Sequence, residues 1–134
     1  MLILFSTNPT FIRQAVASGV DGVIVDWEYV GKEQRQAGVN TQIGRDTLDD
    51  LRRVRASTDG LVICRLNIYG TKTKVEVEEA IDAGADELLL PMVRTVAEVE
   101  AVLDYVGGRC EVGILIETVE AVELVEELAL LPLS

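Results

Sequence analysis

The sequence predicts an α/β fold built on a parallel sheet, and three observations support this prediction. Apolar runs of strand length alternate with segments of helical periodicity along the 134 residues. The apolar runs are near-continuous, which is typical of parallel strands buried on both faces. Glycine, Asn-Pro and Thr-x-x-Glu signals separate these segments. We therefore expect five strand–helix units forming a five-stranded parallel sheet covered on both faces.

The five expected strands are short apolar runs, at residues 2–5, 21–27, 61–66, 86–90 and 111–116. Three of the helices between them are expected to begin at polar capping residues, namely Asn8, Asp46 and Thr95, the last in a capping box with Glu98. A further helix over about 74–83 should end at Gly84, and the last should run over about 118–130.

Charge and composition exclude several classes of protein. The chain has 12 Lys and Arg against 23 Asp and Glu, a formal net charge of −11, and no histidine. A surface this acidic does not suit a nucleic acid or an anionic membrane. Without histidine there is no Ser-His or Cys-His nucleophile pair and no His-ligated zinc or haem. Acid–base chemistry must therefore fall to Asp, Glu, Tyr, Lys or water.

Other features are those expected of a cytoplasmic protein. No apolar run approaches the roughly 20 residues of a membrane span, and the apolar start is too short for a signal peptide. Cys64 and Cys110 lie in or beside apolar runs and form no C-x-x-C motif, so we expect two reduced cysteines that pack as small hydrophobic side chains.

Two architectures use such strand–helix units. A flavodoxin-like doubly wound sheet of five units fits about 130 residues, whereas a TIM barrel of eight units needs at least about 200. Length alone favours the doubly wound sheet. The chain has no G-x-G-x-x-G or Walker loop, so the polar residues at the strand ends must decide.

Charged side chains follow four successive predicted strands. The segments are Asp26-Trp27-Glu28-Tyr29, Arg65-Leu66-Asn67, Pro91-Met92-Val93-Arg94 and Glu117-Thr118. In both architectures ligands bind at the carboxyl ends of the strands, so we expect one site there. Arg65 and Glu117 lie in apolar runs, where an ionised group is costly unless it is paired or bound to a metal. A purely structural alternative is that Arg65 pairs with Asp26 or Glu28.

This set of side chains suits the chemistry of 2-oxo acids. A carboxylate such as Glu117 is a hard oxygen ligand for Mg²⁺, which keeps other positions for water or substrate oxygens. The Arg65 guanidinium can bind a substrate carboxylate in a bidentate manner. A metal on the keto oxygen would then stabilise an enolate, which is the central step of a metal-dependent aldolase or lyase.

Four motifs in order resemble the HpcH/HpaI aldolase and citrate lyase beta-subunit family of phosphoenolpyruvate/pyruvate-binding TIM barrels. They are Gly19–Glu28, Cys64–Asn67, Ala83–Asp86 with Leu90–Thr95, and Ile114–Thr118. The resemblance implies a divalent metal, Mg²⁺ first with Mn²⁺ or Co²⁺ as alternatives. It also implies a carbon–carbon lyase that forms or cleaves a 2-oxo acid (the enolate of pyruvate or oxaloacetate) or a citryl- or malyl-type substrate.

The resemblance also implies roles for matching residues. Glu117 would be one of two acidic metal ligands, and Arg65 would bind the substrate carboxylate. Asp26 and Glu28 would lie beside the metal-bound water and the acid–base groups. The other substrate-binding candidates are Asn67, Pro91, Met92, Lys32 and Arg35. The last two resemble a basic motif that meets an acyl or CoA-bearing substrate in the citrate lyase branch, and a solvated loop is the alternative for them.

The chain departs from the family pattern at two places. Tyr29 stands where relatives carry histidine or aspartate, and a tyrosine with a pKa near 10 is a poor base at neutral pH. It can still donate a hydrogen bond to an oxyanion, which leaves metal-bound hydroxide as a candidate base. The family's second acidic ligand lies on a strand that would follow Ser134. We therefore expect residues 1–134 to be one domain, the N-terminal five of eight barrel units.

Two alternative functions follow from these departures. A partial barrel leaves open sheet edges and an apolar interior, which favours association. The chain could thus act only as an assembly module, and we expect a homo-oligomer in either case. The other alternative is a compact flavodoxin-like binding domain.

Overall fold

The computed structural model describes residues 1–29 and 46–134 as one parallel five-stranded sheet with its helices. The strands are β1 (Ile3–Phe5), β2 (Gly22–Asp26), β3 (Leu61–Arg65), β4 (Glu87–Leu90) and β5 (Glu111–Ile114). The helices are α1 (Pro9–Ala17), α3 (Leu48–Ser57), α4 (Thr73–Asp82), α5 (Val96–Val106), α6 (Val119–Glu123) and α7 (Val125–Leu128). All five predicted strands are confirmed, each one or two residues shorter than its predicted run.

The order of the strands decides between the two architectures. The strands lie in consecutive order, β1-β2-β3-β4-β5, and every neighbouring pair is parallel. A flavodoxin-like sheet reverses direction and has the order 2-1-3-4-5, so that alternative is wrong. Consecutive parallel strands joined through helices are the arrangement of a TIM barrel. The described residues therefore form a partial TIM barrel.

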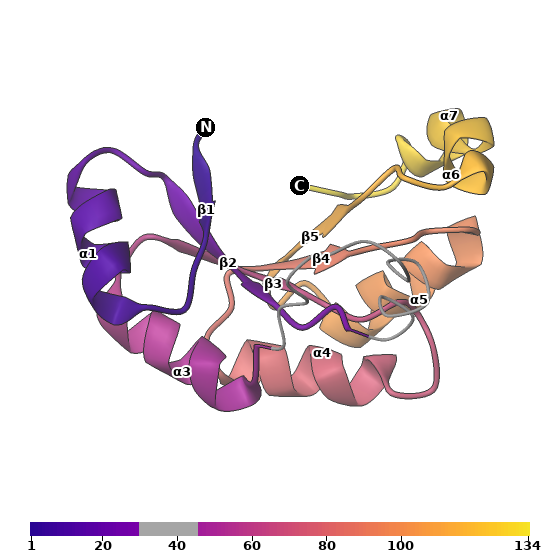
Figure 1. The fold of residues 1–134 in the computed structure, drawn as a ribbon. Coiled ribbons are helices and arrows are strands. Elements are labelled where there is room, and N and C mark those ends of the chain that lie inside the picture. Colours follow the sequence, from indigo (N-terminus) through magenta and orange to yellow (C-terminus); the bar gives the residue numbers. More distant parts are fainter. Residues whose placement is uncertain (30–45) are drawn as a thin grey trace, which may run out of the picture.

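The helices lie along one side of this sheet. Right-handed crossovers that always step in the same direction bring every following helix to the same face, and Figure 1 shows α1, α3, α4 and α5 along that outer side. The expectation that helices cover both faces is therefore not met by these four helices. No described helix has both the length and the apolar character that crossing a membrane requires.

Alternate strand residues serve the two faces. Val25, Cys64 and Leu88 are fully buried and belong to one hydrophobic core with side chains of the helices. The strand residues directly before and after these point to the inner face. There Ile24 and Ile63 are register partners, as are Asp26 and Arg65. The core therefore fixes the outer face, while the inner face presents the strand ends.

The predicted helix starts are confirmed in part. Asn8 caps α1 by accepting a hydrogen bond from Phe11 N (3.1 Å), and Thr95 caps α5 by accepting one from Glu98 N (3.2 Å). The Glu98 carboxylate, however, accepts from Arg94 N instead of closing the capping box. The final helix is divided at Leu124 into α6 and α7.

Asp46 is not the cap that the sequence suggested. Thr47 caps α3 and forms a capping box with Asp50. The Asp46 carboxylate instead accepts a hydrogen bond from the backbone N–H of Asp26 (2.8 Å). Thr47 is an equally good cap one position later, which releases Asp46 for this long-range contact with the end of β2.

Arg55 joins several loops at the amino ends of β3 and β4. Its guanidinium donates hydrogen bonds to the carbonyl oxygens of Thr58 (2.6 Å), Gly60 (2.8 Å) and Gly84 (3.3 Å). It also donates to Asp86 (2.7 Å). Gly84 has φ +94°, and a Cβ there would lie 2.8 Å from Arg55 Cγ, so this position requires glycine.

Replacing Arg55 by alanine should lower the free energy of unfolding by about 2–3 kcal/mol, because several carbonyl groups lose a charged donor. The matched control is Arg52→Ala on the same helix. Arg52 is 59% exposed, and its ion pair among the described residues is with Asp49, an exposed residue of the same helix, so its loss should cost less than about 1 kcal/mol. Urea denaturation followed by circular dichroism measures the free energy of unfolding of both variants. Equal losses in the two variants would contradict the stabilising role of Arg55.

Candidate active site

Asp26 and Arg65 end neighbouring strands and form the centre of the site. They are register partners of β2 and β3, so their side chains leave the sheet side by side on the same face. Arg65 Nε donates to Asp26 Oδ1 (2.9 Å), and Nη2 donates to Oδ2 (2.7 Å). The sequence alternative in which Arg65 pairs with a carboxylate is thus confirmed, in a side-on bidentate geometry.

Glu28 completes this group from the segment after β2. Its Oε2 lies 3.2 Å from Arg65 Nη1, and its backbone N–H donates to Asp26 Oδ1 (3.0 Å). The side chains of Arg65, Asp26 and Glu28 are only 16%, 12% and 4% exposed. The hydrogen bond with Asp26, more than any other contact, raises the pKa of Arg65. Arg65 is therefore a fixed cation, and its guanidinium also lies 5.4 Å from the centre of the Phe5 ring.

Asn67 is fixed by bonds from two sides. Its Oδ1 accepts from the backbone N–H of Tyr29 (3.0 Å), and its Nδ2 donates to Glu76 Oε1 (2.8 Å). The second oxygen of Glu76 accepts from the Asn67 backbone N–H (3.2 Å). The predicted residues Tyr29 and Asn67 are thus brought together. Tyr29 itself is 44% exposed.

Glu117 contributes a carboxylate from the segment after β5. Its Oε1 accepts a hydrogen bond from the backbone N–H of Met92 (2.9 Å), and its charge helps to raise the pKa of Arg65. Met92 has φ +52°, the left-handed region, and it follows the buried Pro91 at the end of β4. Strain of this kind is held only where the surroundings fix it, and it is common at functional sites. The hydroxyl of Thr118 donates to the Val93 carbonyl and joins the same two segments.

Not every predicted residue joins this group. Arg94 turns away from it to pair with Glu98 of α5 (3.3 Å), so the expected second guanidinium at the strand ends is absent from the site. Lys32 and Arg35 lie outside the described residues. Sequence reasoning in turn missed Asp46, which holds the backbone of Asp26, and Glu76, which holds Asn67.

The described residues of the site include more carboxylates than guanidiniums. One guanidinium, Arg65, lies among five carboxylates that contact it or its neighbours, those of Asp26, Glu28, Asp46, Glu76 and Glu117. Residues 1–29 and 46–134 contain no group of three or more side chains arranged to hold a metal ion. Of these five described residues, Glu117 is the exposed one, whereas the other four are buried or half-buried. It suits Mg²⁺, which binds one or two carboxylates and completes its octahedron with water or substrate oxygens.

These strand-end residues match a known pattern. The sequence model of the HpcH/HpaI aldolase/citrate lyase family matches residues 1–131. The chain belongs to this family. No curated protein matches the chain significantly.

Solved structures agree with the barrel architecture. The citrate synthase SbnG has a TM-score of 0.71 at 19% identity, with 97% of this chain and 56% of that protein aligned. Two mandelate oxidase variants have TM-scores of 0.58 and 0.60 at 19% and 18% identity. They align with 79% and 85% of this chain, which covers 37% and 41% of their lengths. The chain thus spans only 37% to 56% of the length of these proteins, and at these identities the likeness shows the fold.

Cys64 lies on the outer face of β3, directly before Arg65. It is a free, fully buried cysteine, and Cys110 is a half-buried one. Burial raises the pKa of the Cys64 thiol well above its ordinary value, and the charges of Glu76, Asp26 and Asp46 add to this. Burial raises the pKa of Cys110 as well, but Arg109 opposes this effect.

Iodoacetamide at pH 8 should therefore modify Cys110 at least about tenfold faster than Cys64, because the thiolate is the reactive form. Mass spectrometry of peptides from the native protein measures both rates. In denaturant the two rates should become similar, which serves as the control. Faster modification of Cys64 in the native protein would contradict the described packing.

Proposed function

We propose that this chain carries the substrate-binding end of a metal-dependent carbon–carbon lyase, one that forms or cleaves a 2-oxo acid or a citryl- or malyl-type substrate. The observation that supports this most is the fixed Arg65 guanidinium beside the Glu117 carboxylate at the carboxyl ends of the strands. Membership of the aldolase/citrate lyase family agrees with this reaction class.

Arg65 is the proposed ligand for the substrate carboxylate. Arginine has five N–H groups. The recorded contacts with Asp26 and Glu28 use one on each nitrogen, so each terminal nitrogen keeps a second N–H for substrate. Because Asp26 already holds the guanidinium, little side-chain freedom is lost when a carboxylate binds.

Glu117 is the proposed protein ligand for Mg²⁺, or for Mn²⁺ or Co²⁺. When bound, such a metal stabilises negative charge on a substrate oxygen. A carboxylate is a hard oxygen ligand of the kind that these ions bind. The Met92 N–H fixes one oxygen of Glu117, which leaves the other oriented for a cation.

The remaining residues have proposed supporting roles. Asp26 positions Arg65, and Glu28 is the nearest further carboxylate for proton transfer. Tyr29 is exposed at the same edge and can donate its hydroxyl proton in a hydrogen bond to an oxyanion. Pro91 and Met92 supply the wall beside Glu117.

Proton exchange on pyruvate tests the function without knowledge of the second substrate. With Mg²⁺, Mn²⁺ or Co²⁺ present, the protein should speed the exchange of the pyruvate methyl protons for deuterium, measured by proton NMR in heavy water. Glu117→Gln should reduce this exchange at least about a hundredfold. Glu120→Gln, the same change three residues later on α6, is the control and should keep it. A folded protein with no metal-dependent exchange would refute the proposal.

Assembly is the second candidate function, and an exposed aromatic side chain on the inner face favours it. Phe5 is 55% exposed, and its ring lies 5.4 Å from the Arg65 guanidinium. Such side chains are typical of surfaces that associate. We propose that a second copy of the chain covers this face.

Sedimentation velocity should accordingly show an oligomer that Phe5→Ser weakens at least about tenfold, since the change removes a large apolar contact. Phe11→Ser on α1 is the matched control, because Phe11 is 50% exposed on the opposite, helical side. A monomer at all concentrations, or equal effects of the two changes, would contradict the assembly role.

A further inference from the structure

Glu76 begins a chain of hydrogen bonds that runs from α4 to the ends of β3 and β2. It lies in the first turn of α4 and is half-buried. Its Oε2 accepts from the Asn67 backbone N–H (3.2 Å), and its Oε1 accepts from Asn67 Nδ2 (2.8 Å). Asn67 Oδ1 in turn accepts from the backbone N–H of Tyr29 (3.0 Å). Glu76 is therefore linked to Tyr29 through one side chain, that of Asn67, which is 6% exposed.

These three bonds match every donor to an acceptor. The donors are two N–H groups of Asn67 and one of Tyr29, and the acceptors are the two oxygens of Glu76 and Oδ1 of Asn67. An ionised carboxylate only accepts hydrogen bonds, whereas an asparagine amide donates at one end and accepts at the other. Glu76 therefore requires the NH₂ group of Asn67 to face it, which directs the amide oxygen toward Tyr29.

The Tyr29 N–H is the last of three consecutive backbone donors that are bound where β2 ends. Trp27 N donates to the carbonyl at the end of β3 (2.9 Å), and Glu28 N donates to Asp26 Oδ1 (3.0 Å). The third bond, to Asn67, ties the far end of this segment to the chain that follows β3. The orientation of the Asn67 amide thus helps to fix the segment that carries Glu28 and Tyr29.

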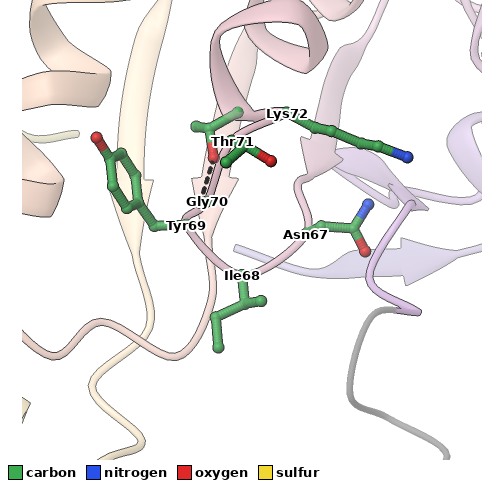
Figure 2. A pocket seen from close by; sticks show the side chains of 7 residues that line it. Asn67, Ile68, Tyr69, Gly70, Thr71 and Lys72 are labelled. Carbon is green, nitrogen blue, oxygen red and sulfur yellow. Dashed lines mark hydrogen bonds between the residues drawn. The ribbon is translucent and has the colours of Figure 1, made fainter.

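The loop between Asn67 and α4 has stabilising bonds of its own. Gly70 N donates to Thr73 Oγ1 (2.8 Å), and Thr73 N donates to the Gly70 carbonyl (3.2 Å). Figure 2 shows this loop, with Asn67 and Tyr69 extending to opposite sides. A carboxylate in the first turn of a helix also interacts favourably with the helix dipole. A purely structural role of Glu76 would therefore act on the loop and the helix, and not on the segment after β2.

We infer that Glu76 is a positioning residue of this site. By setting the orientation of the Asn67 amide, it fixes the segment that carries Glu28 and Tyr29. The inference rests on the proposed function, in which these two side chains transfer a proton and stabilise an oxyanion. Both recorded hydrogen bonds of Glu76 are with Asn67, so its effect on the reaction passes through Asn67 and leaves the proposed ligands for the substrate carboxylate and the metal in place.

Glu76→Gln tests this role, because it replaces one acceptor by a donor at nearly constant shape. Three N–H groups then compete for two oxygens, and two donors face each other in any orientation of the amides. Hydrogen exchange of the Tyr29 amide, measured by NMR, should become at least about tenfold faster. The Gly70 amide, which Thr73 holds, is the internal reference and should change less than about twofold. Glu79→Gln, the same change at an exposed position of α4, should leave both amides unchanged.

A double mutant tests whether Glu76 acts through Asn67. Asn67→Ala should speed Tyr29 exchange by a similar factor, and adding Glu76→Gln to it should produce no further increase. Amides within β3, such as that of Ile63, should keep their protection and show that the variants are folded. Glu76→Gln alone remains decisive if the Asn67 variant does not fold.

The kinetic test uses the metal-dependent exchange of pyruvate protons. Glu76→Gln should lower kcat at least about tenfold and change KM less than about twofold, because the substrate and metal ligands keep their places whereas Tyr29 loses its fixed position. An unchanged Tyr29 amide, an equal increase at Gly70, or an unchanged kcat would overturn the inference. A protein without pyruvate exchange would refute the proposed function instead, and the amide rates would still decide whether Glu76 positions Tyr29.

Discussion

Two opposite charges meet at the ends of β2 and β3 with little water around them, and the geometry of the site follows from that contact. The side chains of Arg65 and Asp26 are 16% and 12% exposed. Removing such charges from water is costly, and the attraction between them offsets this cost only when the hydrogen bonding is good. Here both carboxylate oxygens accept from the guanidinium, and Asp46 fixes the backbone N–H of Asp26. Losing either charge removes this contact between buried side chains, and breaking a buried ion pair costs about 3–5 kcal/mol. The pair therefore ties site geometry to stability.

The two ends of the sheet use arginine in different ways. At the amino ends, Arg55 binds carbonyl oxygens and Asp86, which closes the turns that precede β3 and β4. At the carboxyl ends, the described partners of Arg65 are the carboxylates of Asp26 and Glu28 and the ring of Phe5. In barrels of parallel strands, the first end serves stability and the second serves chemistry. The chain follows that division although the described residues form only part of a barrel.

The strands and most helix caps could be predicted from the sequence, because the signals for them are local. An apolar run marks a strand, and the capping side chains of Asn8 and Thr95 bond to backbone only three residues away. Strand order was not accessible in this way. The same strand–helix units can add to either edge of a sheet, and only the family resemblance favoured the consecutive order that the structure has. The pairing of Arg65 with Asp26 was among the alternatives, since both end apolar strands. The contacts of Asp46 and Glu76 were missed because their partners lie 20 and 9 residues away in sequence. From sequence alone, a carboxylate near the start of a helix is interpreted as a cap or as a solvated charge. The proposed roles of Lys32 and Arg35 stay predictions.

The sequence has no histidine, so positive charge at the strand ends must come from arginine, lysine or a bound metal. In the part of the site that the structure describes, Arg65 is the guanidinium that contacts the carboxylates, and its charge attracts an anionic substrate. Arg65 is already shared between Asp26 and Glu28, which leaves part of its charge for a ligand. Under the proposed function, a divalent ion at Glu117 would add positive charge at the reacting end of the substrate, beside the guanidinium of Arg65. The two contributions can be removed separately, because Arg65 ends β3 whereas Glu117 follows β5.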